Sequence, residues 1–420
     1  MINVQNNRKF DFETVSVDEF WNTGEEKELK MHRIHAYPAK FPAFITTKAL
    51  NYAYAQSLHV DSMADIFCGC GTTAFEAKRN KINFWGCDIN PVATLIAKAK
   101  SKKYQPRRLL NYLNRISARF AYGPVENVYS AAPERLKYWY KEKQYNDLFL
   151  LKKVILHFTP PSSDYRLFFL CAFSNILKST SVWLTKSIKP QVDPNKKPRD
   201  VMAAFREQCR SMMVANAEID SLSDSESEIV TGSFLGTALS PPAVDLIVTS
   251  PPYVTSYEYA DLHQLSTLWL DFALDYRELR EGSIGSRHHA YNFNREWKRL
   301  NHTGARIVSR LLDQHKSKAR SVTKYFLDMQ QVAHRVHGML NDRGIVLFVI
   351  GNTEYKGVRI DNAKHLSESL FSAGFNCVQA TKRKISKKIL TPYRDERGKF
   401  SSDSSGRKVY SEEFILIGRK

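Results

Sequence analysis

Residues 62–101 read SMADIFCGCGTTAFEAKRNKINFWGCDINPVATLIAKAKS. The apolar runs, the glycine pair and the Asn90-Pro91 step predict a strand, a tight turn, a helix, a second strand and then a further helix. Strands that alternate with helices in this way are typical of a parallel sheet with helices packed on it. The expected fold class is therefore α/β.

Residues 101–228 lack this alternation and have mainly helical periodicity, as in PERLKYWYKEKQYNDLFLLKKVILHF. The region is strongly basic, because residues 101–210 contain 21 Lys and Arg against 8 Asp and Glu. It includes a Pro- and Lys-rich loop at 189–199, which cannot be helical throughout, and it ends in the acidic, serine-rich SLSDSESE. We interpret residues 101–228 as a mainly helical basic insertion.

The α/β pattern resumes at residue 229. VDLIVTSPPY, residues 244–253, predicts an apolar strand that runs into a proline turn and is followed by an amphipathic helix. We expect a polar loop over 276–305, a long helix over about 306–340 and a buried strand over 343–353. Two last strands that flank a basic loop would close the sheet with an antiparallel hairpin, a common variant of doubly wound folds.

The composition narrows the class of protein. The net charge is +19, with 43% hydrophobic and 25% charged residues. These proportions are ordinary for a globular chain and exclude a disordered protein, a fibre or a disulfide-stapled miniprotein. The basic surplus favours a polyanionic partner, above all nucleic acid.

Other features concern location and metals. The N-terminus has no apolar run after a basic end, and the apolar stretches are too short to span a bilayer, so we expect no membrane partner and a cytoplasmic location. The six cysteines form no CxxC pair and no His/Cys cluster at zinc spacing, so no metal site is expected.

A candidate ligand site is the run from Asp65 to Thr73, DIFCGCGTT, with Asp88 at the end of the next strand. Glycines let the backbone turn sharply and approach a ligand without a Cβ in the way. An acidic residue about 20 positions later is placed to accept hydrogen bonds from ribose hydroxyls. A dinucleotide site would need a third glycine where Ala74 or Phe75 stands, so an adenosyl compound is favoured over NAD. A tight turn that binds no ligand is the alternative.

A second candidate is TSPPY, residues 249–253, at the carboxyl end of a strand, where the ligand sites of open α/β sheets lie. Two consecutive prolines fix φ and remove two N–H donors, which leaves rigid carbonyl acceptors. With a hydroxyl before them and an aromatic ring after them, such a site can grip an amino group in the plane of a flat base. A turn that only ends the strand is the alternative.

Together the two motifs resemble those of a known family, the DNA amino-methyltransferases that use S-adenosylmethionine (AdoMet). The glycine motif of that family is close to DxFxGxGTT and its catalytic motif is [DNS]PP[YFW], and residues 35–42, HAYPAKFP, are similar to its HxYPAKFP segment. The resemblance covers roughly residues 31–100 and 229–420. It implies a Rossmann-like AdoMet-dependent methyltransferase sheet, and it does not explain the insertion.

The resemblance also implies roles for individual residues. Ser250 and the carbonyl of Pro251 would accept hydrogen bonds from the exocyclic amine of the target base, and Tyr253 would stack on that base. The implied catalytic residues are Ser250, Pro251, Pro252 and Tyr253. Asp88 would hold the ribose of AdoMet. The implied cofactor-binding residues are Tyr37, Lys40, Phe41, Pro42, Asp65, Phe67, Gly69, Gly71, Thr72, Asp88 and Ser233.

Some residues depart from the family pattern. Ile66 and Cys70 replace the commoner proline and serine of the glycine motif, and Ser233 stands where many relatives have an acidic residue near the adenine of AdoMet. The insertion also separates the two motifs. No cysteine nucleophile is needed for this chemistry, so we expect Cys68 and Cys70 to be packing residues.

The implied activity is site-specific methylation of an exocyclic amine on a flipped DNA base. In this family the serine form of the catalytic motif leans towards cytosine N4, and the Asp or Asn forms lean towards adenine N6. Cytosine N4 is therefore favoured, and adenine N6 is the first alternative. An RNA amino-methyltransferase and a non-catalytic nucleic-acid-binding protein on the same fold are further alternatives.

Double-stranded DNA is the expected partner, with Lys196, Lys197 and Arg199 as the first phosphate contacts. A solvated basic loop is the alternative for each of them. We expect base reading from the insertion or from 276–305, and the stretch 382–399 adds a basic surface. A cognate restriction endonuclease stays open as a partner. The expected domains are 1–100, the first half of the catalytic domain; 101–228, the insertion; and 229–420, the second half.

Overall fold

The computed structural model describes most of the chain. The described residues are 1–4, 11–24, 27–38, 40, 42–123, 126–219, 222–254, 259–286, 291–385, 393–394, 400–401, 407–408 and 411–420.

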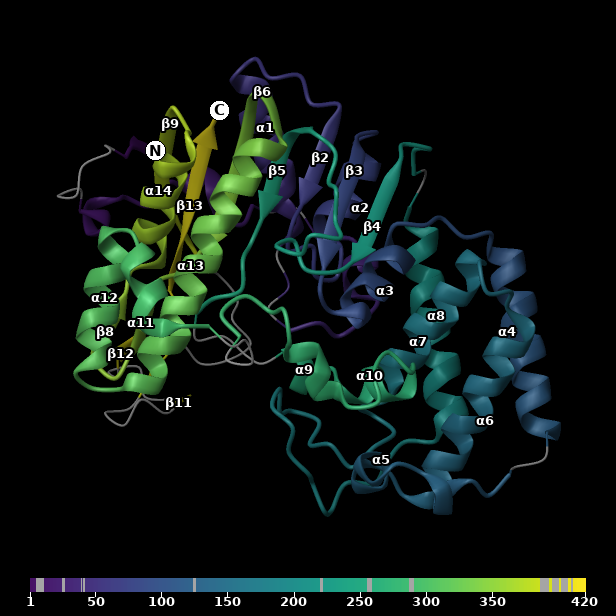
Figure 1. The fold of residues 1–420 in the computed structure, drawn as a ribbon. Helices are drawn as coiled ribbons and strands as arrows, with labels where there is room; N and C mark the ends of the chain where they lie inside the picture. Colours follow the sequence, from purple (N-terminus) through teal and green to yellow (C-terminus); the bar gives the residue numbers. More distant parts are fainter. Residues whose placement is uncertain are drawn as a thin grey trace.

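An eight-stranded sheet forms the centre of the molecule (Figure 1). Its strands are β1 (Ile2–Asn3), β2 (Ser62–Asp65), β3 (Asn83–Asp88), β4 (Ser227–Thr231), β5 (Val244–Thr249), β6 (Leu340–Ile350), β9 (Cys377–Lys384) and β13 (Glu412–Arg419). Their order across the sheet is β1-β9-β13-β6-β5-β2-β3-β4. The five strands from β6 to β4 are parallel, and β13 runs antiparallel to both β6 and β9. The predicted α/β fold class, with its antiparallel closing strand, is confirmed.

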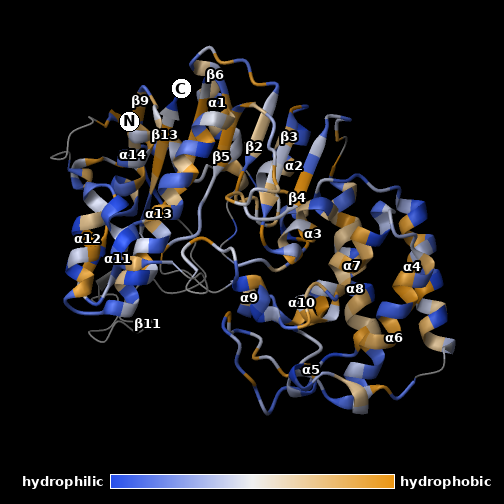
Figure 2. Ribbon diagram, viewed as in Figure 1, coloured by the Kyte–Doolittle hydropathy of each residue, from blue (hydrophilic) through white to orange (hydrophobic). Residues whose placement is uncertain are grey.

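Helices cover both faces of the sheet. The helices next to it are α1 (Ala43–Ala55), α2 (Thr72–Arg79), α3 (Pro91–Lys100), α12 (His302–Leu312), α13 (Lys316–Met339) and α14 (Asn362–Ala373). Met63 and Leu246 pack with α1 and α2 on one face, while Ala64 and Ile247 pack with α12, α13 and α14 on the other. Adjacent residues of a strand point to opposite faces, so a strand covered on both sides is apolar throughout. Figure 2 shows β5 and β13 as largely hydrophobic beneath more hydrophilic helices.

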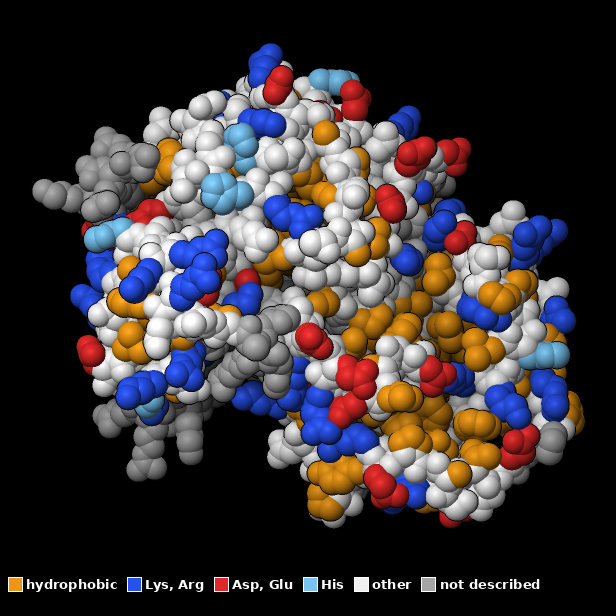
Figure 3. All heavy atoms as spheres, in the orientation of Figure 1, with side chains coloured by type: hydrophobic (Ala, Val, Ile, Leu, Met, Phe, Trp, Pro, Cys, Tyr) orange, Lys and Arg blue, Asp and Glu red, His pale blue; other side chains and the backbone are white. Residues whose placement is uncertain are grey.

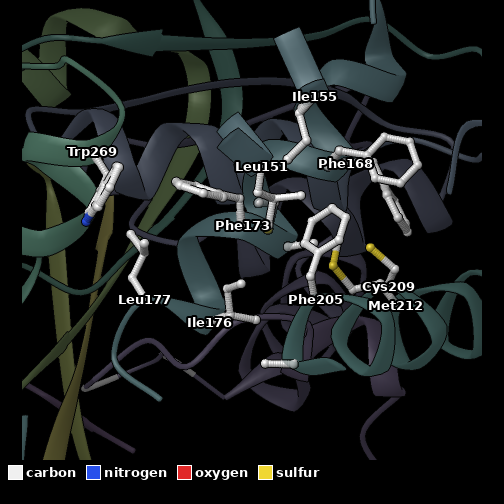
Figure 4. Close-up of a cluster of buried hydrophobic side chains, with 14 of the residues drawn as sticks. Leu151, Ile155, Phe168, Phe173, Ile176, Leu177, Phe205, Cys209, Met212 and Trp269 are labelled. Carbon is white, nitrogen blue, oxygen red and sulfur yellow. The ribbon is translucent and has the colours of Figure 1, made fainter. Parts of the chain in front are cut away.

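A helical unit lies beside the sheet, between β3 and β4 in the sequence. Its helices are α4 (Pro106–Tyr122), α5 (Glu134–Trp139), α6 (Glu142–Phe158), α7 (Asp164–Ile176) and α8 (Val201–Ala217). They share a hydrophobic core that includes Leu151, Phe173 and Phe205 (Figure 4) and extends to residues of α2 and α3. Trp269, which follows the TSPPY motif in the sequence, is part of the same core. The helical unit is therefore packed firmly against the segment that carries the second motif.

Two predicted helices are interrupted. The helix expected over 306–340 is divided between α12 and α13 by His315, whose φ of −152° and ψ of 84° are extended. The helix expected after the proline turn is divided into α9 (Tyr259–Leu262) and α10 (Gln264–Trp269). His263 separates these two at φ −103° and ψ 9°. At His263 the apolar periodicity continues through the break, whereas the break at His315 lies in the polar run DQHKSK, residues 313–318.

The remaining elements are short. The 3-10 helices are η1 (Phe12–Thr14), η2 (Glu19–Trp21), η3 (Lys30–Arg33), η4 (Tyr129–Ala131), η5 (Tyr276–Arg280) and η6 (Trp297–Arg299). The others are α11 (Phe293–Glu296) and the strands β7 (Thr353–Tyr355), β8 (Val358–Ile360), β10 (Tyr393–Arg394), β11 (Phe400–Ser401) and β12 (Arg407–Lys408). The expected loop 276–305 thus contains η5, α11 and η6. None of the helices in the described part of the chain is long and apolar enough to cross a membrane.

Candidate active site

The strand order reverses between β2 and β5. From β2 the chain continues outward to β3 and β4, whereas β5 is followed by β6 on its other side. The carboxyl ends of β2 and β5 are therefore neighbours at a topological switch point, where open α/β sheets bind their ligands. Both sequence motifs begin there, the glycine motif at Asp65 and the TSPPY motif at Thr249. In Figure 1 these strand ends point toward α9 and the helical unit.

Asp65 joins the two motifs. Its Oδ1 accepts hydrogen bonds from Thr249 Oγ1 at 2.7 Å and from the Phe67 amide at 3.1 Å, and its Oδ2 accepts one from Thr73 Oγ1 at 3.0 Å. The side chain is buried, and burial raises the pKa of Asp65 to about 6. Because both oxygens face protein donors, Asp65 holds the two loops in place rather than presenting its carboxylate outward.

The glycine loop depends on two left-handed residues. Gly69 has φ +49° and Gly71 has φ +74°, a region that residues with a Cβ rarely adopt. Gly71 caps the start of α2, and a methyl group on it would lie 2.5 Å from the Cβ of Ala97 in α3. Cys68 and Cys70, before and between the glycines, are buried.

Asp88 lies directly beside the glycine loop. Its Oδ2 accepts a hydrogen bond from the Gly69 amide at 2.9 Å, and its Oδ1 accepts one from the Asn90 amide at 2.8 Å. Desolvation raises the pKa of Asp88 to about 6. A carboxylate has about four acceptor positions, and these two bonds use only part of that capacity.

Residues of the HAYPAKFP segment have different surroundings. The Tyr37 ring lies against Gly69, whose added methyl would be 3.6 Å from Tyr37 Cε1, and it stacks on His263 with ring centroids 5.0 Å apart. The Lys40 ammonium instead donates to Glu28 Oε2 at 2.7 Å and to a backbone carbonyl at 3.0 Å. Pro42 caps the start of α1. Phe41 lies outside the described residues.

The helical unit holds this segment. His35 Nε2 hydrogen-bonds Ser174 Oγ in α7 at 2.9 Å, and the Ala36 amide donates to Asn175 Oδ1 at 2.9 Å. Gln208 of α8 donates to the carbonyl of the residue just before the segment, Ile34, at 2.6 Å. Residues of the helical unit therefore hold in place the segment that carries Tyr37. No sequence motif marked these polar residues of α7 and α8.

Three further cofactor candidates lie around the glycine loop. Phe67 is half-buried against the core beneath α12 to α14, and Thr72 is buried at the first position of α2. Ser233 Oγ donates to the Gly282 carbonyl at 3.3 Å. An added methyl on Gly282 would lie 2.9 Å from Ile89 Cδ1, so this loop closes tightly over the end of β3. Sequence reasoning did not single out Ile89 or Gly282.

The TSPPY motif is held by the end of β6. Ser250 Oγ donates a hydrogen bond to the Val349 carbonyl at 3.0 Å. A hydroxyl that donates its proton in a hydrogen bond to a carbonyl can still accept hydrogen bonds with its lone pairs. The Tyr253 ring lies against Gly351, where a methyl would be 2.9 Å from Tyr253 Cε2, and its hydroxyl donates to Glu413 Oε1 at 3.0 Å. Between them, Pro251 is buried and Pro252 is half-buried.

The three basic residues expected to contact phosphate differ in their surroundings. The Lys196 ammonium donates to the carbonyls of Lys178 and Trp183 at 2.8 and 2.6 Å, and burial lowers its pKa to about 8. Lys197 is exposed, and Arg199 is exposed and paired with Glu207. The space-filling view shows Lys and Arg both on the helical unit and around α11 and α12 (Figure 3). The basic surface is therefore not confined to one segment.

The described residues contain no group of three His, Cys, Asp or Glu side chains that could hold a metal ion.

Comparisons with known proteins find methyltransferases. A family model described as "DNA methylase", of the N6/N4 type, matches residues 3–99. The chain is 23% identical to the type II methyltransferase M.MvaI of Kocuria varians, over 95% of this chain and 92% of that protein. It is 33% identical to M.MjaII of Methanocaldococcus jannaschii over 90 residues, 21% of this chain and 16% of that protein. Among solved structures, the rRNA methyltransferase aviRa of Streptomyces viridochromogenes aligns over 93% of this chain and 91% of that one, with 10% identity and a TM-score of 0.30.

Proposed function

We propose that this chain, an AdoMet-dependent DNA methyltransferase of the N6/N4 family, methylates the exocyclic N4 amine of cytosine in double-stranded DNA. The observation that carries the proposal is the hydrogen bond between Asp65 and Thr249, which holds the glycine loop and the TSPPY motif side by side at the switch point. A methyl donor and a base amine must meet at one place, and this is the place where both motifs begin.

The residues around Gly69 fit an adenosyl ligand. Neither Gly69 nor Gly71 presents a Cβ, and Asp88 retains acceptor positions suited to two ribose hydroxyls. The Asn90 side-chain amide is buried and has no acceptor for its Nδ2 among the described residues. A buried donor without an acceptor is costly, so a ligand acceptor at this point would relieve it. Asp88, Asn90 and the glycine loop would hold AdoMet, which supplies an electrophilic methyl group on a sulfonium sulfur.

Ser250 and the Pro251 carbonyl would act on the amine of the base. An exocyclic amine is a poor nucleophile, because its lone pair is delocalised into the ring. Acceptors on its two hydrogens favour a tetrahedral nitrogen with a localised lone pair, and they stabilise the positive charge that develops on it. The Ser250 hydroxyl suits this role because its proton is already engaged by the Val349 carbonyl.

Tyr253 would receive the base after it leaves the duplex. Flipping a base costs a few kcal/mol, and stacking on an aromatic ring recovers about 1–3 kcal/mol. The ring is half-buried, with its hydroxyl end held inside the protein.

We assign DNA binding to the helical unit, which lies in the expected insertion over residues 101–228. Lys197 and Arg199 are exposed on its loop and suit phosphate contact, whereas the Lys196 ammonium already serves two carbonyls. The match to type II methyltransferases makes a cognate restriction endonuclease the expected functional partner.

Nucleoside analysis of methylated DNA tests the proposal. Duplex DNA treated with the protein and AdoMet is digested to nucleosides, and the product is identified by mass and retention time. We expect N4-methylcytosine. N6-methyladenine would contradict the choice of cytosine, although it would support the same site for methyl transfer to a base amine. Transfer only to structured RNA, or AdoMet binding with no transfer, would contradict the proposed function.

A further inference from the structure

A buried ion pair lies behind the aromatic ring of the catalytic motif. Glu413 Oε1 accepts the hydrogen bond from the Tyr253 hydroxyl at 3.0 Å, and its Oε2 accepts a hydrogen bond from Arg383 Nη2 at 2.6 Å. The two oxygens of one carboxylate thus connect the tyrosine to an arginine from another strand. Tyr253 is separated by more than a hundred residues from both partners, so only the closing of the sheet brings them together.

The sheet fixes the geometry of this pair. Glu413 in β13 and Arg383 in β9 are direct cross-strand partners in the antiparallel ladder. The Arg383 side chain is only 4% exposed and that of Glu413 17% exposed. Buried charges need partners of this kind to be tolerated, so neither side chain is free to turn toward solvent. Arg383 belongs to the basic stretch that we expected to contact DNA, and its position assigns it to the protein interior instead.

A second contact restrains the hydroxyl end of the ring. Gly351, just after β6, lies so close that a methyl group there would be 2.9 Å from Tyr253 Cε2 and 3.3 Å from Cζ. The carbonyl of Val349, two residues earlier, holds Ser250. The ends of β6 and β13 therefore contact both functional side chains of the TSPPY motif.

We infer that Glu413 is a positioning residue for methyl transfer, which fixes the direction in which the Tyr253 ring extends and therefore the place where the target base stacks. The inference rests on the proposed function. A ring bonded only through its Cβ can turn about two torsions. The hydrogen bond at the hydroxyl restrains the first torsion, because the oxygen lies on the axis of the second, and the close contact with Gly351 limits the second. Methyl transfer needs the amine in line with the methyl group and sulfur, and a displacement of about 1 Å can lower a rate about 100-fold. Arg383 orients the Glu413 carboxylate through its hydrogen bond to Oε2.

The test is a mutant cycle on Tyr253 and the ion pair. Y253F keeps the ring and removes the hydroxyl. R383M/E413L removes both charges together, because loss of one alone would leave an unpaired buried charge, whereas an apolar pair of similar volume is often tolerated. E412Q is the matched control. Glu412 is the neighbouring residue of β13, so its side chain points to the opposite face of the sheet from Glu413, and it pairs with Lys382 at 3.9 Å.

Single-turnover methylation rates, AdoMet affinity and melting temperature are measured for each variant. We expect Y253F and R383M/E413L each to lower the rate about 10-fold or more with AdoMet affinity unchanged, and the triple variant to be no slower than the slower of the two. E412Q should retain the wild-type rate. A wild-type rate in R383M/E413L would overturn the inference about Glu413, as would losses that multiply in the Y253F/R383M/E413L variant. Neither result would contradict the proposed function. Absence of transfer by the unaltered protein would contradict the proposed function and the inference with it.

Discussion

Thr249 Oγ1 donates a 2.7 Å hydrogen bond to Asp65 Oδ1. These are the last residues of β5 and β2, which are neighbours in the sheet at the point where the strand order reverses. Each is followed at once by one of the two functional loops. The bond therefore sets the distance between the loop that would hold the cofactor and the loop that would hold the base amine.

Removal of this bond should weaken the fold. T249V replaces the hydroxyl with a methyl group, and loss of a hydrogen bond to a charged group costs about 1.5–3 kcal/mol of unfolding free energy. Burial raises the pKa of Asp65 from 3.8 to about 6, so protonation favours the folded state. That contribution is complete below about pH 4 and is lost as the pH rises through 6. Above pH 6 the Asp65 carboxylate is charged, and a charged acceptor makes a stronger hydrogen bond with Thr249. T249V should therefore lower the free energy of unfolding more near pH 8 than near pH 5.

Urea unfolding at the two pH values measures this difference. T249S, which keeps the hydroxyl, is the control and should recover most of the loss. Equal stability of T249V and wild type near pH 8 would show that the bond does not support the fold.

Substitution of Gly71 should be costly for two separate reasons. G71A combines a left-handed backbone at φ +74° with a methyl group 2.5 Å from Ala97 Cβ, and we expect a loss of about 2–5 kcal/mol from strain and overpacking together. G357A is the matched control, because Gly357 has φ +81° and nothing within 4 Å of an added methyl. It should cost only about 1–2 kcal/mol. Thermal or urea unfolding compares the two, and equal losses would mean that helix contact at Gly71 is unimportant.

AdoMet binding should depend on the ionisation of Asp88. Its pKa of about 6 means that the carboxylate is charged above that pH and protonated below it. A protonated carboxyl has less acceptor capacity, so AdoMet affinity should fall as the pH drops below 6, by up to about 10-fold per pH unit. Calorimetric titration between about pH 5 and pH 8 measures this dependence.

The D88N variant distinguishes the titration of Asp88 from that of Asp65. Asp65 also has a pKa of about 6, but both of its oxygens accept hydrogen bonds from protein donors. D88N should bind AdoMet weakly, with no inflection near pH 6. A wild-type pH profile in D88N would exclude Asp88 as the ribose ligand.

The two lysines of the loop that carries Lys196, Lys197 and Arg199 should have different roles, one in DNA binding and one in stability. K197A and R199A should weaken DNA binding and flatten its salt dependence, by about one unit of log–log slope for each phosphate that is no longer neutralised. K196A should instead lower the melting temperature, because the Lys196 ammonium serves two backbone carbonyls, and it should leave the slope unchanged. An unchanged slope in K197A/R199A would mean that this loop does not bind DNA.

The elements of the site that sequence could predict are those whose signal is local. Gly69, Gly71 and Asp88 are recognisable because a left-handed turn demands glycine and because strand spacing sets the distance to the acidic residue. The closing antiparallel strand was predictable from two apolar runs that flank a polar loop. The helix break at His263 was not, because the apolar periodicity continues through it. The break at His315 lies in the polar run 313–318, which is equally compatible with the exposed face of a continuous helix.

The supporting residues of the site could not be predicted from sequence. Val349, Gly351 and Glu413 reach the TSPPY motif only through the pairing of β5 with β6 and of β6 with β13. Nothing in an apolar strand distinguishes the residue whose carbonyl holds Ser250. In the same way, the basic character of Lys196 suggested DNA contact, and only the folded loop places its ammonium against two carbonyls.

In the proposed mechanism Ser250 acts on the amine of the base and not on the cofactor. Methyl transfer from labelled AdoMet into duplex DNA, measured for wild type and S250A together with the AdoMet affinity of each, distinguishes these two roles. We predict that S250A lowers the transfer rate about 100-fold or more while AdoMet affinity stays within about 3-fold of wild type. Equal losses of rate and of AdoMet affinity, or an unchanged rate, would contradict the role given to Ser250.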